Sequence, residues 1–172
     1  MKKMIAGILI FLISFAATAR EGSGFYMSAG GSFPSADDGT TSIDPINIYV
    51  RVGYDFNDYV GIGIEGNNSL IDDDVFSSIS YGINLYTAYL KGSIPIEERI
   101  RLNAIIGRSN VELTETFSFI LTGYEEDYDY TRGIGIEYSF GSKNSLTVDY
   151  IDYYDKNGVD ISAFNIGYTG YF

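Results

Sequence analysis

The sequence predicts an all-β protein, an eight-stranded antiparallel up-and-down transmembrane β-barrel. Short segments with apolar residues at every second position recur along the chain, and this period of two is that of a strand with one apolar face. The composition of 16 Tyr, 11 Phe and 20 Gly with only 3 Pro favours strands over helices. Short and long connections alternate between the segments, which is typical of transmembrane barrels.

Residues 1–19 have the pattern of a secretory signal peptide. Lys2 and Lys3 form a positive start, residues 4–15 are apolar, and a small-residue cleavage site ends at Ala19. We therefore expect a signal peptide at 1–19 and a barrel domain at 20–172. A membrane anchor is the alternative, and it is disfavoured because the apolar run is shorter than the roughly 20 residues that a span needs.

The alternating segments predict eight strands. In chain order they lie at 25–33, 46–56, 59–67, 80–92, 99–112, 128–140, 145–154 and 160–172. The connections at 57–58, 95–98 and 141–144 are short, whereas those at 34–44, 68–79 and 113–127 are predicted to be long loops. An even number of strands, with short turns at one end and long loops at the other, is the pattern of a barrel that crosses a membrane.

The sequence allows two orientations of the strand at 80–92 relative to the lipid. Its outward residues are either Tyr86, Ala88 and Leu90 or the pair Ile83 and Leu85. The two sets differ in parity, so a bulge within the strand would be needed for both to face outward.

The last connection also has two interpretations. Asn157-Gly158 has the sequence of a two-residue hairpin turn. That register would turn Phe164 and the apolar positions after it inward, because a slip of one residue moves every side chain to the other face. We therefore predict a three-residue loop at 156–158.

The stretch GIGIE occurs twice, at 61–65 and at 133–137, and predicts two strands with unlike faces. Its isoleucines are expected to face lipid. Its glycines, together with Glu65 and Glu137, are expected to face the lumen of a barrel so narrow that side chains must fill it.

Charged residues are predicted to pair inside this lumen. A short turn that pairs Phe56 with Val60 places Arg51 opposite Glu65. Counting alternate residues along the other strands places further charged side chains on the lumen face. The predicted network comprises Arg51, Lys91 and Arg101 with Glu65, Glu137 and Asp149. Charges removed from water must pair or change protonation, so structural ion pairs are the main interpretation. Carboxylates that catalyse acid–base chemistry or line a conducting pore are the alternatives.

The charge of the chain limits its partners. The net charge is −12, which argues against nucleic acid, and the absence of Cys excludes disulfides. The predicted long loops are acidic, and their carboxylates are Asp37, Asp38, Asp72, Asp73, Asp74, Glu112, Glu115, Glu125, Glu126 and Asp127. A solvated, repulsive surface is the main interpretation, with a divalent-cation site or a cationic partner as alternatives. The aromatic residues Phe76, Phe117, Phe119 and Tyr124 could contact such a partner.

The C-terminal stretch AFNIGYTGYF places Phe164, Ile166, Tyr168 and Phe172 on one face. It resembles the C-terminal sorting signal of Gram-negative outer-membrane barrels and departs from it at Gly170. With the signal peptide and eight strands, the mature chain resembles the small OmpA/OmpX-type barrel family along nearly its full length.

This resemblance implies a location and a set of partners. The location is the outer membrane of a Gram-negative bacterium, and the partners are outer-membrane lipid, lipopolysaccharide and the barrel assembly machinery, with a cationic or host surface ligand as an alternative. It implies no further domain after the barrel, no cofactor, no metal and no catalytic residue. The implied role is structural or surface interaction, in envelope integrity, adhesion or resistance to host defences. A small ion or solute channel is the runner-up. A lipid-modifying barrel enzyme is third, since such enzymes use a histidine and this chain has none.

Overall fold

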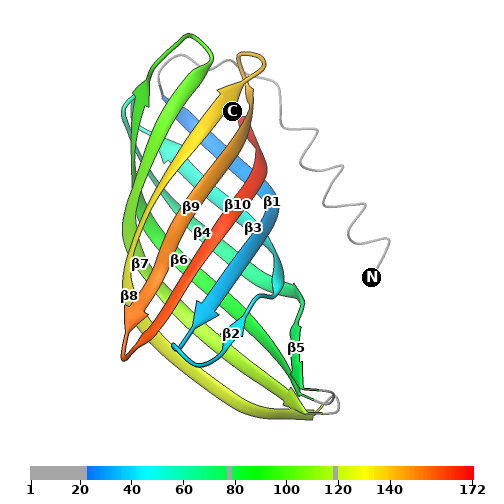
Figure 1. Cartoon of the computed structure of the whole chain (residues 1–172). Coiled ribbons are helices and arrows are strands. Elements are labelled where there is room, and N and C mark those ends of the chain that lie inside the picture. The colour runs from blue at the N-terminus through cyan, green and yellow to red at the C-terminus, as the bar shows by residue number, and fades with distance from the viewer. Residues whose placement is uncertain (1–22, 77–78, 118–119) are drawn as a thin grey trace.

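The computed structural model describes residues 23–76, 79–117 and 120–172, which form one closed antiparallel barrel (Figure 1). The predicted signal peptide lies outside these residues. The barrel strands are β1 Gly24–Asp37, β3 Ile46–Asp55, β4 Val60–Ile71, β6 Ile79–Pro95, β7 Ile100–Phe117, β8 Ile120–Ser139, β9 Asn144–Lys156 and β10 Val159–Tyr171. Two short strands, β2 Ser42–Ile43 and β5 Asp73–Phe76, pair with β1 and β6.

Pairing between the first and last strands closes the barrel. β1 and β10 are antiparallel and paired from Tyr26 opposite Tyr171 to Asp37 opposite Asp160. The terminal Phe172 adds a hydrogen bond of 2.9 Å from its N–H to the carbonyl of Phe25. Closure satisfies the backbone groups that an open edge would expose to lipid. The predicted fold class, an eight-stranded up-and-down barrel, is therefore confirmed.

The two ends of the barrel differ. The turns at 56–59, 96–99 and 140–143 lie together with Phe172 at one end, which we call the turn end. The opposite loop end carries β2, β5 and the long strands β6, β7 and β8, which extend together at this end (Figure 1). The prediction of long loops at 68–79 and 113–127 was wrong in part. β4 continues to Ile71 and is followed by β5, and β7 and β8 continue as strands through the described residues of 113–127.

The β9–β10 connection is a two-residue turn, so the prediction of a three-residue loop was wrong. Lys156 pairs with Val159, and Asn157 and Gly158 have φ values of 56° and 80°, as a type I′ turn requires. The register then shifts between Ile161 and Ser162, which leaves Tyr153 as an extra residue in β9. This bulge restores the parity of the faces, so the rest of β10 still presents its apolar residues outward.

Strand β6 keeps a single parity along its whole length. Its register with β7 is continuous from Ile79 opposite Phe117 to Pro95 opposite Arg101. Ile83 and Leu85 are fully buried in the lumen, whereas Tyr86 and Leu90 point outward. The bulge considered for this strand is therefore absent, and two apolar residues face inward instead.

The outer surface is a lipid-facing band. Ile62, Ile64, Ile134 and Ile136 are 41–69% exposed, as expected for the apolar face of the GIGIE strands. Exposed aromatic residues flank the aliphatic ones on both sides, which is typical of transmembrane barrels. Toward the turn end they are Phe25, Phe56, Tyr59, Tyr138, Phe140 and Tyr168, and toward the loop end Phe33, Tyr128, Tyr130, Tyr150 and Phe164. Within residues 23–76, 79–117 and 120–172, no helix has the length and apolar character needed to cross a membrane.

The lumen-facing glycines make room for large side chains from other strands. A Cβ at Gly63 would lie 2.5 Å from the Tyr89 hydroxyl, and one at Gly135 would overlap the Asp149 carboxylate. The narrow lumen of an eight-stranded barrel is filled by side chains, so each bulky residue needs a small one facing it. This explains why glycine alternates with isoleucine in both GIGIE copies.

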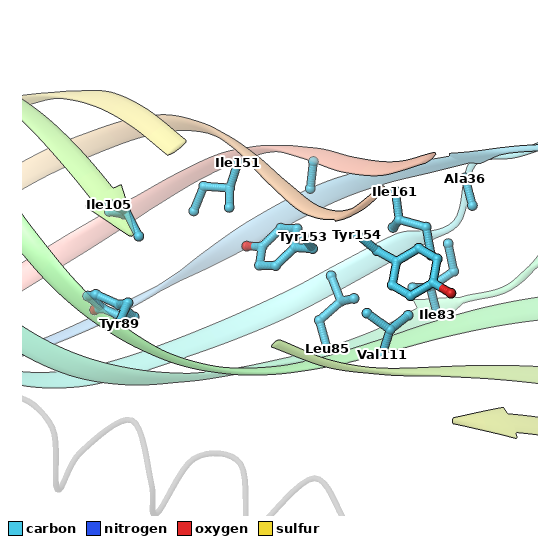
Figure 2. Packing of buried hydrophobic residues seen from close by; sticks show 11 residues of the cluster. Ala36, Ile83, Leu85, Tyr89, Ile105, Val111, Ile151, Tyr153, Tyr154 and Ile161 are labelled. Atoms are coloured by element: carbon cyan, nitrogen blue, oxygen red, sulfur yellow. The ribbon is translucent and has the colours of Figure 1, made fainter. Parts of the chain in front are cut away.

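The loop-end half of the lumen is apolar, which the sequence analysis did not foresee. Figure 2 shows the buried apolar cluster, which fills this half and continues to Tyr89 and Ile105 beside the charged groups. Its members are Ala36, Ile83, Leu85, Tyr89, Ile105, Val111, Ile151, Tyr153, Tyr154, Ile161 and Ala163. Ile83, Leu85 and Tyr153 are fully buried, so this layer excludes water from the barrel interior on the side of the loops.

We predict that Gly135→Ala lowers the free energy of unfolding by about 1–3 kcal/mol, because the added methyl displaces the Asp149 carboxylate. Gly92→Ala on the outer face is the matched control, since its Cβ would lie 4.0 Å from the nearest atom. Urea unfolding in lipid vesicles measures both variants. Equal stability of the two would mean that the lumen is not packed around Asp149.

Candidate functional site

Arg51 lies in the middle of the lumen and is ion-paired with carboxylates from two other strands. The β3–β4 register places it directly opposite Glu65, to which its Nε donates. Its Nη1 donates to Asp149 on β9, three strands away around the barrel, so the pairs connect opposite walls. Arg51, Glu65 and Asp149 are 4%, 5% and 1% exposed. Because all three are removed from water, each charge depends on its partners.

Neighbouring aromatic and amide groups hold this charged centre. The Arg51 guanidinium lies over the Tyr49 ring, 4.6 Å from its centroid. The Tyr153 hydroxyl donates to Glu65 Oε1 at 2.6 Å and accepts from Asn165 Nδ2 at 3.1 Å. The bulge in β9 places Tyr153 and Tyr154 both inside, so this irregularity supplies a hydrogen bond to the buried carboxylate.

A layer of amides separates the charges from the apolar cluster. Asn47 Nδ2 donates to Asn67 Oδ1 at 2.9 Å and to the Ile83 carbonyl at 2.8 Å. Asn67 Nδ2 in turn donates to Ser32 Oγ at 2.8 Å. Asn47, Asn67 and Ser32 are fully buried. The polarity of the lumen therefore decreases stepwise, from ion pairs through amides to aliphatic side chains.

The other predicted cations lie nearer the turn end. Lys91 Nζ forms an ion pair of 2.8 Å with Asp55 and lies 4.0 Å from the Tyr26 ring centroid. Arg101 forms an ion pair of 3.0 Å with Asp58 in the β3–β4 turn. Asp55 is 5% exposed, so the predicted balance of three cations and three anions left out one buried carboxylate.

Glu137 is 2% exposed and is hydrogen-bonded within the lumen. Ser145 Oγ and the Tyr171 hydroxyl donate to its Oε1 at 2.8 and 2.6 Å. The β7–β8 register places Arg101 opposite it. The structure thus brings Arg51, Glu65 and Asp149 into one cluster, and it distributes Lys91, Arg101 and Glu137 around the turn end.

The space left among these charged groups is small. Arg51, Lys91, Glu137 and Asp149 line a cavity of about 20 Å³. This volume holds about one water molecule. The described side chains therefore leave little open space at this level of the lumen.

Exposed carboxylates dominate the loop end. They are Asp37, Asp38, Asp44, Asp72, Glu125, Glu126, Asp127, Asp155 and Asp160. The exposed cations at this end are Arg108, Arg132 and Lys156. The side chains of Phe76, Phe117, Phe119 and Tyr124, proposed as contacts for a partner, lie outside the part of the chain whose side chains are described. The described residues contain no group of three or more His, Cys, Asp or Glu that could hold a metal ion.

Asp160 lies in the β9–β10 hairpin, beyond the aromatic residues that flank the lipid-facing band. It pairs with Asp155 across β9 and with Asp37 across β1. Partial burial raises the pKa of Asp160, and the nearby Asp152 and Asp155 carboxylates raise it further. The three strands therefore carry like charges directly opposite one another, which is unfavourable when all are ionised.

The residues of the predicted sorting signal lie on the outer surface of β10 and just after it. Phe164, Ile166 and Tyr168 are 41–51% exposed, and Phe172 is half-buried at the turn end. The Tyr168 ring contacts Phe140, just after β8, at a centroid distance of 5.9 Å. These side chains belong to the band that faces lipid.

Comparisons with known proteins agree with this architecture. The sequence model described as "Outer membrane protein beta-barrel domain" matches residues 5–172. No curated protein matches the sequence. The chain is similar in structure to Neisserial surface protein A, with a TM-score of 0.69 and 15% identity over 88% of this chain and 100% of that one.

Two further solved structures have the same fold. Ail, the attachment invasion locus protein of Yersinia pestis, in complex with the heparin analogue sucrose octasulfate, gives a TM-score of 0.66 and 15% identity over 88% of this chain and 99% of that one. The outer membrane protein OprG from Pseudomonas aeruginosa gives a TM-score of 0.61 and 12% identity over 90% of this chain and 97% of that one. At these identities the similarity concerns the fold alone.

We predict that Arg51→Ala destabilises the barrel by about 3–5 kcal/mol, because it leaves buried carboxylates without their cation. A double-mutant cycle with Glu65→Ala should give a coupling energy of about 1–3 kcal/mol. The control cycle is Arg132 with Asp152, an ion pair of 2.7 Å in which the Arg132 side chain is 73% exposed, and such pairs contribute about 0.2–1 kcal/mol. A coupling for Arg51 and Glu65 no larger than that of the control would contradict the buried centre.

We also predict a pH-dependent effect of Asp160→Asn. A raised pKa means that the folded state favours the protonated carboxyl, so ionisation of Asp160 destabilises the fold as pH rises through the folded-state pKa. The amide should therefore raise the urea midpoint at pH 7, and the gain should disappear as pH falls below the unfolded-state pKa of about 3.9. Urea titrations across this range measure it. A gain that is independent of pH would show that charge is not the cause.

Proposed function

Because the chain belongs to the outer membrane protein beta-barrel family, we propose that it is a closed, non-enzymatic barrel with a structural or surface-interaction role in the Gram-negative outer membrane. The filled lumen carries this proposal. Ion pairs around Arg51, amides around Asn47 and an apolar cluster around Leu85 occupy successive levels of the interior. Roles in envelope integrity, adhesion or resistance to host defences need only the outer and extracellular surfaces of such a barrel.

A small channel is the competing function. It would require a continuous path of water, and the described lumen instead has a cavity of about 20 Å³ at its charged level and fully buried apolar side chains beyond it. Opening a path would require breaking the pairs of Arg51 and displacing Leu85 and Tyr153 together. The packing therefore favours a plugged barrel over a pore.

Catalysis by a lipid-modifying site is disfavoured on chemical grounds. Arg51 already donates to one oxygen of each of the buried carboxylates Glu65 and Asp149. They also lie inside the wall, away from the lipid-facing surface where an acyl chain would be cleaved. The chain has no histidine to serve as a general base.

The charge of the loop end suggests the kind of surface partner. The related fold of Ail has been observed with a heparin analogue, a polyanion. In this chain the exposed loop-end carboxylates outnumber the cations there, so a polyanion would be repelled. We infer that a surface partner of this barrel is cationic.

The proposed location in the outer membrane requires export of the chain and its assembly into the membrane. The positive start and apolar run at 1–19 would direct export, with cleavage near Ala19. The outward residues Phe164, Ile166, Tyr168 and Phe172 would then be recognised by the barrel assembly machinery. Lipid and lipopolysaccharide would surround the finished barrel.

We predict that the purified protein gives no stepwise conductance in planar bilayers and does not admit small sugars into vesicles, because its lumen is plugged. Insertion is verified in the same preparation by heat-modifiable migration on electrophoresis, which reports the folded barrel. Reproducible unitary conductance from folded, inserted protein would overturn the proposal in favour of the channel.

A further inference from the structure

A pocket of about 400 Å³ opens at the loop end, above the apolar cluster that seals the lumen. Its floor is formed by Val111, Tyr154 and Ile161, which are 4%, 8% and 1% exposed. Leu113 and Val159, both partly buried, continue the apolar lining upward. The pocket thus lies within the mouth of the barrel between β7, β8, β9 and β10. Its volume is within the range of small-molecule sites in proteins.

Carboxylates line the other side of this pocket. Glu125, Glu126 and Asp127 follow one another at the outer part of β8, and all three are exposed. The β7–β8 register places Glu125 opposite Leu113 and Asp127 opposite Val111. Each of these two cross-strand pairs therefore joins one apolar and one acidic side chain.

The charge of this acidic side is maintained by its surroundings. The Tyr154 hydroxyl donates to Asp127 Oδ2 at 2.8 Å, and this hydrogen bond is the main cause that lowers the pKa of Asp127 below its usual value. Lys156 lies beside the pocket but is not part of its lining: its Nζ pairs with Asp129 at 3.3 Å, donates to the Tyr128 carbonyl and lies 5.8 Å from the centroid of the Tyr154 ring. No cation is among the residues described as lining the pocket.

We propose that this pocket binds a small organic cation with an aromatic body, of the arylalkylammonium class. The aromatic body would displace water from Val111, Leu113 and Ile161 and contact the Tyr154 ring. The ammonium group would lie toward Glu125 and Asp127, where charge complementarity favours it over a neutral or anionic group. This site goes beyond the proposed role of the barrel, because it lies outside the sealed lumen and requires no passage through it.

The test uses 2-(1-naphthyl)ethylammonium as the probe, with 2-(1-naphthyl)ethanol and 1-naphthylacetate as neutral and anionic counterparts. The chain has no Trp, so the barrel itself adds no tryptophan emission to the naphthalene signal. Titration into lipid nanodiscs that hold the full barrel, with empty nanodiscs subtracted, separates the site from partition into lipid. We expect saturable binding of the ammonium, at least about threefold weaker binding of the alcohol, and the weakest binding of the carboxylate.

Three variants distinguish binding in the pocket from general attraction of the probe to the acidic protein. Glu125→Gln should weaken binding of the ammonium about threefold and leave the alcohol unchanged. Leu113→Gln should weaken both probes. Glu97→Gln is the matched control, because it removes the same charge from an exposed position at the turn end and should change nothing.

Three outcomes would overturn the proposal. They are equal affinity for the ammonium and the alcohol, an equal loss in Glu125→Gln and Glu97→Gln, and no saturable binding above empty nanodiscs. Folding of each variant is checked by heat-modifiable migration, so a loss of binding is assigned to the pocket only in a folded barrel.

Discussion

The pairing of Arg51 with Glu65 and Asp149 is the interaction on which the interior of this barrel depends. One guanidinium joins β3, β4 and β9, so it ties together opposite walls that share no backbone hydrogen bonds. A barrel of eight strands leaves an interior that side chains must fill, and charges placed there must be paired. Arg51 spans the lumen and pairs with one buried carboxylate on each side of it.

The size and placement of the neighbouring residues are determined by this cluster of Arg51, Glu65 and Asp149. Asp149 occupies the space that a side chain at Gly135 would need, and Tyr89 similarly requires glycine at position 63. Tyr153 reaches Glu65 because a bulge turns it inward beside Tyr154. Beyond the charges, amides and then aliphatic side chains fill the lumen, and the outermost of these side chains form the floor of the loop-end pocket. The same side chains therefore fill the loop-end half of the lumen and give its mouth an apolar base.

Much of the fold could be predicted from the period of two in the sequence, because lipid selects one apolar face per strand over a membrane-sized length. The strand extensions at 113–127 could not, since a strand above the membrane needs no apolar outer face. Ile83 and Leu85 were ambiguous because an apolar side chain satisfies either lipid or a dry lumen. A short turn and parity suffice to place Arg51 opposite Glu65, whereas its contact with Asp149 depends on barrel closure and curvature, which no local pattern contains.

The most direct test of this account is nuclear magnetic resonance of the arginine guanidinium groups in lipid nanodiscs. Arg51 donates from Nε and Nη1 inside the lumen, so its guanidinium protons should exchange slowly with water and should show couplings across hydrogen bonds to the carboxylates of Glu65 and Asp149. Arg132, whose side chain is 73% exposed, provides the fast-exchanging reference in the same spectrum. Exchange at Arg51 as fast as at Arg132, without such couplings, would contradict a lumen closed by these ion pairs.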